Sequence, residues 1–313
     1  MIDVACVGIM VADVMIQPVN AIPARGMLEQ VDMIQLHTGG NAMTAAININ
    51  TMGLKSAVIG NVGYDSLGDF LVSSLDKQGI NTKNVARDKN AQTSASVVFL
   101  ADDGERSFSH CVGANGTFRM ENVDWSVIEE AKIVFVTGVF LLNEFDTYDL
   151  TEFLKKCKEM GKITALDVCW DSKGRWNTIL HPAMPYIDIF LPSIDEAKKI
   201  ADKETPAECA EFFFEEGVGS VVIKLGGDGC YVQETKDSES IILPCCKGVT
   251  AVDTTGAGDS FCSGFLAAYS QGKSFIDCAK FANATGALCV TSVGATTGMK
   301  KYDEVEEFMK SHS

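Results

Sequence analysis

The stretch AVDTTGAGDSF, at residues 251–261, determines how the rest of this chain is interpreted. Its small residues Gly256, Ala257 and Gly258 form a glycine-rich turn, and Phe261 then begins an apolar pattern with helical spacing. The first amides of a helix have no partner within the helix, and small side chains let a ligand approach them. The turn therefore predicts an anion-binding site at the start of a helix.

Asp259 lies at the mouth of this predicted anion site. A carboxylate in that position can accept the proton of a hydroxyl that attacks a phosphoryl group. The alternative is an ordinary strand-to-helix turn in which Asp259 caps the helix. The complete segment favours the functional interpretation, with Asp259 as the general base and the backbone of residues 256–259 as the anion hole.

Short apolar runs of strand length recur along the rest of the chain, and helical patterns lie between them. The runs cover residues 4–9, 133–136, 163–167, 187–191 and 221–223. The helical patterns cover residues 149–160 and 206–216. Runs with so few polar residues are typical of buried parallel strands. The alternation predicts an α/β fold with a doubly wound, mostly parallel sheet.

Two stretches, at about residues 10–37 and 91–113, break this alternation and have the pattern of β-hairpins. The second contains an apolar run, a turn at Asp102, Asp103 and Gly104, and a further strand-like run. They predict a small β-sheet that covers one end of the main sheet as a lid. No internal repeat or linker separates it, so residues 1–313 are expected to form a single domain.

The charge and cysteine content exclude several classes of protein. A formal net charge of −16 repels phosphate backbones, which disfavours nucleic-acid binding, and it disfavours a basic membrane-binding face. No apolar run reaches membrane-spanning length. The 11 cysteines include no C-x-x-C pair, which disfavours zinc and disulfide frameworks. We expect a cytoplasmic protein with reduced thiols.

The string DTTGAGD at residues 253–259 resembles the C-terminal signature of the ribokinase, or PfkB, family of carbohydrate kinases. The resemblance implies a ribokinase-like fold and ATP-dependent phosphorylation of an alcohol group on a small sugar. It implies that Asp259 is the general base and that Gly256, Ala257 and Gly258 form the anion hole. ATP and Mg²⁺ are the expected cofactors, and a homodimer formed through the lid is the expected assembly.

A second segment, TGGNAM at residues 38–43, resembles the family's N-terminal glycine pair followed by asparagine. Gly39 and Gly40 would let the backbone approach the substrate, and Asn41 would offer a donor and an acceptor to sugar hydroxyls. Asp13, after the first strand, matches a hydroxyl-binding aspartate of the family. The alternatives are a helix cap for Asn41 and a turn carboxylate for Asp13.

The segment KLGGDG at residues 224–229 resembles the family's nucleotide loop, and it is not a Walker A sequence. The resemblance places Lys224, Gly226 and Gly229 near the ATP phosphates. Asn283 resembles a residue of the adenine pocket.

Glu196 matches the glutamate of the family's N-x-x-E element, which orders magnesium and phosphate through water, although Ser193 replaces the usual asparagine. The alternative for Glu196 is a first-turn carboxylate favoured by the helix dipole. Asp253 and Thr255 match positions that bind a monovalent cation, so the resemblance implies K⁺ there. Gly298 departs from the side-chain oxygen that some members supply nearby.

The acceptor is the least determined feature. Residues 104–108 resemble the lid strand of fructokinase-like and ketodeoxygluconate kinase-like members, and Arg106 either reaches an anionic substrate group or is solvated. A nucleoside kinase is one alternative, but Phe99 and Phe108 make a lid poor in aromatic residues, which favours a sugar. A non-catalytic sugar- or nucleotide-binding regulatory protein is another alternative, and the intact Asp259 disfavours it.

Overall fold

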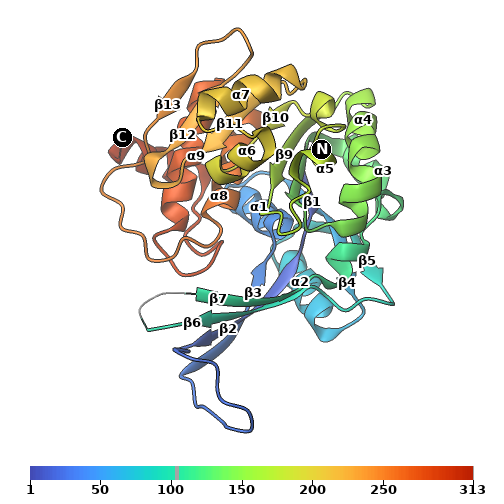
Figure 1. Cartoon of the computed structure of the whole chain (residues 1–313), viewed down its shortest axis with the longest axis vertical. Coiled ribbons are helices and arrows are strands. Elements are labelled where there is room, and N and C mark those ends of the chain that lie inside the picture. The colour runs from blue at the N-terminus through green and yellow to red at the C-terminus, as the bar shows by residue number, and fades with distance from the viewer. Residues whose placement is uncertain (103–105, 313) are drawn as a thin grey trace.

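The computed structural model describes residues 1–102 and 106–312, and within these residues the main sheet has nine strands (Figure 1). Their order across the sheet is β13-β12-β11-β10-β9-β8-β1-β4-β5. The pairs from β11 to β5 are parallel, and β12 and β13 add an antiparallel edge. The predicted mostly parallel sheet is confirmed. The strands are β1 (Ile2–Gly8), β4 (Ser56–Gly63), β5 (Asn81–Asp88), β8 (Ala131–Val139), β9 (Ile163–Val168), β10 (Ile189–Phe190), β11 (Ser220–Lys224), β12 (Cys230–Gln233) and β13 (Ile241–Leu243).

Helices cover both faces of this sheet, as a doubly wound fold requires. Along β1, Val4 and Cys6 belong to one apolar cluster, whereas Ala5 and Val7 belong to the other. Residues of α1, α2, α8 and α9 fill the first cluster, and residues of α3, α4, α6 and α7 fill the second. The helices are α1 (Asn41–Thr51), α2 (Ser66–Lys77), α3 (Trp125–Glu130), α4 (Leu150–Glu159), α5 (Trp176–Leu180), α6 (Ile194–Ala201), α7 (Pro206–Glu215), α8 (Ala257–Ser270), α9 (Phe275–Cys289) and α10 (Tyr302–Ser311).

Strand β10 begins later than the sequence predicts. The apolar run starts at residue 187, but the strand covers Ile189–Phe190. The short turn η4 (Met184–Tyr186) takes the first amide, because the Ile187 N–H donates to the Met184 carbonyl at 3.1 Å. An apolar run therefore marks the strand without fixing where its ladder starts.

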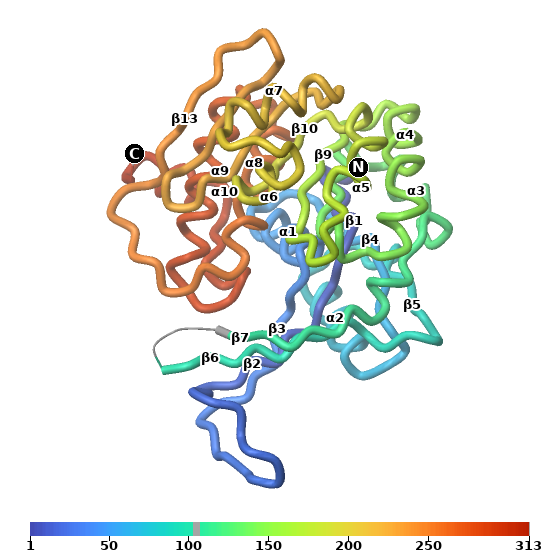
Figure 2. Tube along the Cα trace, viewed as in Figure 1, coloured from blue at the N-terminus to red at the C-terminus, as the bar shows by residue number. Residues whose placement is uncertain are grey.

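A second, smaller sheet contains four strands within the described part of the chain, and we call it the lid sheet. Its strands are β2 (Val11–Gln17), β3 (Met33–Gly39), β6 (Ala95–Leu100) and β7 (Arg106–Cys111), in the order β3-β2-β6-β7. Figures 1 and 2 show these strands together on one side of the main body, with the β2–β3 connection projecting away from it. The predicted separate β-sheet is confirmed. The predicted turn at Asp103 and Gly104, and the side chain of Arg106, lie outside the described residues.

Two long helices, α1 and α8, start at the same place although they are far apart in sequence. Asn48 and Ser260 are both fully buried, and the Asn48 Nδ2 group donates to the Ser260 Oγ atom at 2.9 Å. This contact joins the second turn of α1 to the first turn of α8 and holds the two helices side by side. The N-termini of α1 and α8 lie at the carboxyl ends of the parallel strands, because Gly40 packs against Ile9 after β1 and Gly258 lies beside Lys224 at the end of β11. This is the edge where α/β sheets bind ligands.

Within residues 1–102 and 106–312, none of the helices combines the length and the apolar character that crossing a lipid bilayer would need.

Candidate active site

Asn41 and Asp259 meet at the point where α1 and α8 begin. The Asn41 Nδ2 group donates to Asp259 Oδ1 at 2.7 Å. Gly40 and Gly256 occupy the N-cap positions of the two helices, and neither helix has a side-chain cap. The alternatives in which Asn41 or Asp259 is a plain helix cap are therefore wrong. The two predicted site residues instead contact each other across 218 positions of sequence.

Asp259 lies in surroundings that disfavour its charged form. Burial raises the pKa of the Asp259 carboxyl to about 6, against the opposing effects of the Lys224 charge and the Asn41 hydrogen bond. The negative charge of Glu196 adds to the upward shift. A carboxyl with a pKa near 6 is ionised at neutral pH and is a stronger base than an ordinary aspartate.

The glycine turn before α8 cannot accept larger side chains at its start. Gly256 has φ of 75°, and a Cβ atom there would lie 2.4 Å from the Ala295 Cβ atom. The Ala257 N–H donates to the Thr254 carbonyl at 3.2 Å, so this amide is already engaged. Helix geometry leaves the amides of Gly258 and Asp259 without a carbonyl further back in α8. The predicted anion hole is thus centred on these two amides.

The glycine pair before α1 lets the substrate-side residues pack closely. A Cβ atom on Gly39 would lie 1.9 Å from Asp13 Oδ2, and one on Gly40 would lie 2.5 Å from the Ile9 carbonyl oxygen. Gly40 also has φ of 87°, which favours glycine. Asp13 therefore lies directly against the turn that precedes Asn41. The structure brings together all four residues that the sequence assigned to substrate binding.

Asp13 is a strand residue rather than the turn carboxylate of the alternative interpretation, because it lies within β2 and pairs with His37 and Ser96 on neighbouring strands. Burial raises the pKa of Asp13 to about 6, and a hydrogen bond with the Ser96 side chain opposes that shift. The Ser96 Oγ atom also lies 3.1 Å from His110 Nδ1. Asp13 thus begins a polar row across the lid sheet.

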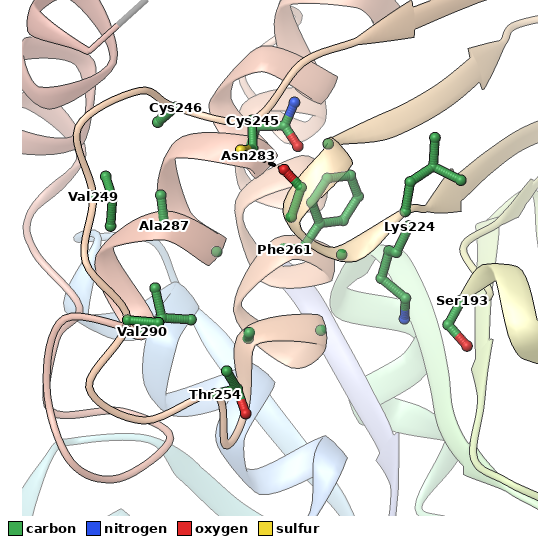
Figure 3. A pocket seen from close by; sticks show the side chains of 18 of the residues that line it. Ser193, Lys224, Cys245, Cys246, Val249, Thr254, Phe261, Asn283, Ala287 and Val290 are labelled. Atoms are coloured by element: carbon green, nitrogen blue, oxygen red, sulfur yellow. Dashed lines mark hydrogen bonds between the residues drawn. The ribbon is translucent and has the colours of Figure 1, made fainter.

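The residues assigned to nucleotide binding line a cavity of about 580 Å³ on the other side of the anion turn. Lys224, Gly226, Gly229 and Asn283 all contribute to its wall, together with Gly258 from the turn itself. Figure 3 shows one side of this cavity formed by small apolar side chains, which are those of Val249, Ala287 and Val290. A cavity of this size with an apolar wall beside an anion site suits a nucleotide.

Two predicted residues support the walls of this cavity. A Cβ atom on Gly229, which has φ of 95°, would lie 2.0 Å from the Leu243 carbonyl oxygen. The Asn283 Nδ2 group donates to the Pro244 carbonyl at 3.0 Å, which ties α9 to the segment after β13. By contrast, a Cβ atom on Gly226 would meet nothing within 4 Å. The open space at Gly226 fits the close approach of a ligand.

Lys224 has a partner that the sequence analysis did not identify. Its Nζ atom lies 2.8 Å and 2.9 Å from the two carboxylate oxygens of Asp167, which is the last residue of the run at 163–167 and lies in β9. The exposed fractions of the two side chains are 12% and 3%. Lys224 therefore lies at the cavity wall as half of a buried ion pair.

Cys169 and Cys262 complete the surroundings of this pair. The Cys169 thiol donates to Asn41 Oδ1 at 3.4 Å, and the Cys262 thiol donates to Asp167 Oδ2 at 3.5 Å. Burial raises the pKa of both thiols, so both are neutral at physiological pH. The available sequence signal was a charged residue at the carboxyl end of a buried parallel strand, which faces the ligand crevice. The two cysteines carried no comparable signal.

Glu196 is a carboxylate in the first turn of α6, as the alternative interpretation predicted. The backbone N–H and the hydroxyl of Ser193 both donate to Glu196 Oε2, at 2.8 Å and 2.6 Å, in a capping box at the start of α6. Burial raises the pKa of Glu196, and the nearby Lys224 charge opposes the shift. Glu196 thus caps a helix while its charge still acts on the Lys224 and Asp259 cluster.

Asp253 braces the loop before the anion turn. Its Oδ1 atom accepts from the Thr255 N–H at 2.6 Å, and its Oδ2 atom accepts from the Gly294 N–H at 2.8 Å. The Thr255 carbonyl accepts from the Cys289 thiol at 3.3 Å. Within the described ranges, no group of three or more His, Cys, Asp or Glu residues is arranged to hold a metal. A monovalent cation here would need main-chain carbonyls as its chief ligands.

Fold and site together fit an α/β phosphotransferase, because a buried carboxyl, a glycine turn at a helix N-terminus and a nucleotide-sized cavity meet at the carboxyl ends of parallel strands. The model of the pfkB family carbohydrate kinases matches residues 1–301, and the chain belongs to that family. It is accordingly an ATP-dependent carbohydrate kinase.

Named relatives are distant but match most of the chain. A fructokinase of Vibrio alginolyticus is 28% identical over 282 residues, which cover 87% of this chain and 91% of that protein. A ribokinase of Haemophilus influenzae is 27% identical and covers 88% of each. The solved structure of Arabidopsis thaliana ribokinase complexed with ribose and ATP is 26% identical, covers 99% of each chain and gives a TM-score of 0.86. The chain is similar to members with different sugars.

Proposed function

We propose that this kinase transfers the γ-phosphoryl group of ATP to a hydroxyl, most simply a primary alcohol, of a small sugar. The observation that carries the proposal is the contact between Asn41 and Asp259, because it joins the substrate-side residues to the catalytic turn. Asp259 lies next to the amides of Gly258 in the first turn of α8. The acceptor hydroxyl would lie between the carboxylate and the anion hole.

In the proposed mechanism Asp259 takes the hydroxyl proton as the new P–O bond forms. Asn41 donates to one carboxylate oxygen, which leaves the other free to accept that proton. The amides at Gly258 and Asp259 stabilise the charge on the phosphoryl oxygens. Asp13, Gly39 and Gly40 hold the sugar.

The cofactors proposed are ATP and Mg²⁺. The cavity beside the anion turn has room for a nucleotide, and the structural relative from Arabidopsis thaliana is complexed with ATP. The carboxylate oxygens of Glu196 suit Mg²⁺, which prefers oxygen ligands and keeps several of its waters. The ion supplies positive charge that neutralises the phosphate oxygens during transfer. Gly226 and Gly229 would contact the phosphates, Lys224 would place its charge near them, and Asn283 would border the adenine.

K⁺ is proposed near Asp253 and Thr255. Both carboxylate oxygens of Asp253 accept hydrogen bonds from backbone amides, which holds the loop in shape. The carbonyl groups of this loop would then bind the ion. Activity measured in K⁺ against a matched concentration of tetramethylammonium tests this role. Equal rates in the two salts would remove K⁺ from the proposal.

The lid sheet is proposed to close over the acceptor within a single-domain kinase, using residues of about 10–37 and 91–113. Closure would exclude water and limit hydrolysis of ATP. Ile34 and Leu36 of β3 are 65% and 40% exposed, which supports a homodimer formed through this sheet. Analytical ultracentrifugation of wild type and of Ile34→Glu tests the dimer. A monomeric wild type would contradict it.

The cytoplasm is the proposed compartment. Each of the 11 cysteines is a free thiol in the structure, including those buried beside the active site. Free thiols in this number suit a reducing environment.

ADP release in the presence of ATP and a panel of sugars and nucleosides tests the proposed function. We expect turnover with one or a few neutral sugars, and none with nucleosides. Turnover with nucleosides would select the alternative acceptor class. Binding of a sugar without ADP release would contradict a catalytic role.

A further inference from the structure

The ion pair between Asp167 and Lys224 lies in a position where burial makes charges costly. The whole Asp167 residue is 2% exposed, and both of its carboxylate oxygens contact the Lys224 ammonium. Buried ion pairs often contribute little or nothing to stability, because desolvation offsets their attraction. A role in the chemistry at this site would explain why these two charges lie here.

The ammonium lies beside the anion hole. A Cβ atom on Gly258 would be 3.6 Å from Lys224 Nζ, so the lysine head group faces the turn that would receive the phosphoryl group. The Lys224 Nζ atom also lies 3.7 Å from Cys262 Sγ, one turn further along α8. Two bonds to Asp167 and one to this sulfur match the three donors of an ammonium. The cation is therefore fixed in direction as well as in place.

Besides Asp167, the Lys224 charge interacts with the carboxylates of Glu196 and Asp259. Burial works against its charge, but Asp167 and Glu196 outweigh that effect and the pKa of Lys224 is raised. The positive charge of Lys224 in turn lowers the pKa of Asp259. The titratable groups that face Lys224 and Asp259 are Asp167, Cys169, Glu196 and Cys262.

It matters which carboxylate pairs with Lys224, because Asp259 needs one free carboxylate oxygen to accept the substrate proton. Asn41 already donates to Oδ1, and a lysine on Oδ2 would occupy the site that accepts the substrate proton. In the structure the ammonium is held by Asp167 on β9 instead. Removing the Asp167 charge would leave Asp259 and Glu196 as the carboxylates that attract it.

We propose that Asp167 is a positioning residue, which keeps Lys224 beside the anion hole as a fixed cation for the migrating phosphoryl group and away from the oxygen of Asp259. This inference rests on the proposed function, since it gives Asp259 the role of the base. Asp167 itself is buried and is not among the residues that line the cavity. It acts through Lys224.

Asp167→Asn is the direct test, because it keeps the shape and removes the charge. We expect kcat to fall about tenfold to a hundredfold, and the acid limb of the kcat/KM profile to move down by about one pH unit, because the freed ammonium pairs with Asp259. Lys224→Met should move the limb up instead, because Asp259 then loses a nearby positive charge. Loss of the Asp167 charge by itself also lowers the pKa of Asp259, because the two carboxylates repel each other, so the shift must be compared with and without Lys224. An unchanged or raised limb in Asp167→Asn would overturn the proposal.

The double variant Asp167→Asn, Lys224→Met removes the buried pair entirely and covers the case in which Asp167→Asn does not fold. Its limb should not lie below that of wild type, and its kcat should stay as low as that of Lys224→Met. If the limb of the double variant lies as far below that of Lys224→Met as the limb of Asp167→Asn lies below that of wild type, Lys224 does not cause the shift, and the proposal is overturned. Full activity in Asp259→Asn would instead refute the proposed function itself.

Discussion

The acceptor end and the nucleotide end of this candidate site are formed by different kinds of residue. The acceptor end uses polar side chains in contact with one another, such as Asn41 with Asp259 and Asp13 with Ser96. The nucleotide end uses glycines and small apolar side chains around a cavity, such as Gly226 and Ala287. The anion turn before α8 belongs to both ends. Under the proposed function, side-chain charge would perform the chemistry, whereas backbone and shape would hold the nucleotide.

The comparison predicts that variants at the acceptor end change kcat, its pH dependence or the KM for the sugar. Variants of the small side chains at the nucleotide end should change the KM for ATP, whereas Lys224, which lies beside the anion turn, should affect kcat. A variant in the shared turn should affect both. The variants below test this division from the largest expected effect to the smallest.

Asp259→Asn should have the largest effect. The amide keeps the size of the side chain but cannot accept the substrate proton, so we expect kcat to fall by about 2–4 decades. Steady-state rates of ADP release measure the loss, and circular dichroism confirms the fold. Ser263→Ala is a matched control in the same helix, because it removes a hydroxyl that donates to the Asp259 carbonyl oxygen without touching the carboxylate. A near-normal rate for Asp259→Asn would refute the assignment of the base.

Gly256→Val should affect both ends together. The new Cβ atom would meet the Ala295 Cβ atom at 2.4 Å, and valine is strained at a φ of 75°. Displacing the turn moves the amides of the anion hole, whose loss typically costs about 100-fold in kcat or more. We expect this loss together with a higher KM for ATP. A change in one parameter alone would show that the turn serves one end.

Ala287→Leu should separate the nucleotide end from the acceptor end. Ala287 lines the cavity, and a larger side chain would fill space that the nucleotide needs (Figure 3). We expect the KM for ATP to rise by about tenfold, which corresponds to about 1.4 kcal/mol, with an unchanged KM for the sugar. Asp13→Asn is the matched control and should give the opposite pattern. Equal effects on both KM values would contradict the division.

Asp146 offers a comparison from outside both ends. Burial raises its pKa to about 7, while the charge of Arg175 and the N–H groups of Phe140 and Leu142 oppose the shift. The unfolded chain ionises this group above about pH 4, so the free energy of unfolding falls as pH rises from there to about 7. Asp146→Asn removes this loss.

We therefore expect the stability advantage of Asp146→Asn over wild type to grow by about 2–3 kcal/mol between about pH 5 and pH 8. Urea unfolding at the two pH values measures it. The acid limb of the rate profile should not move, because this carboxyl has no part in the chemistry. An advantage independent of pH would show that Asp146 titrates normally.

Much of the fold was predictable because buried parallel strands leave a plain signal. The runs at residues 133–136 and 221–223 lie within β8 and β11, and the two hairpin stretches form the lid sheet. The start of β10 was not predictable, because a hydrogen bond from Ile187 to the preceding turn decides it.

The site was predictable where a residue lies in a motif and was missed where it does not. Asn41 and Asp259 belong to two glycine-containing segments, and the structure joins them. Asp167 belongs to no such segment, and its meaning comes from a contact with Lys224 across 57 positions of sequence. Ser193 and Glu196 match a motif position and also form a capping box, so the role of Glu196 at the site stays a prediction. A contact between side chains on different strands, such as that of Asp167 with Lys224, becomes visible only in the folded structure.

The pH dependence of kcat/KM tests the central claim most directly, when wild type and Asn41→Ala are measured side by side. Because the pKa of Asp259 is about 6, the rate of wild type should fall below about pH 6. Asn41→Ala removes a hydrogen bond that favours the ionised carboxyl, so its limb should move to higher pH, whereas titration of the nucleotide would affect both proteins equally. A wild-type rate that is flat down to about pH 4.5, or a limb that Asn41→Ala leaves in place, would contradict Asp259 as the base.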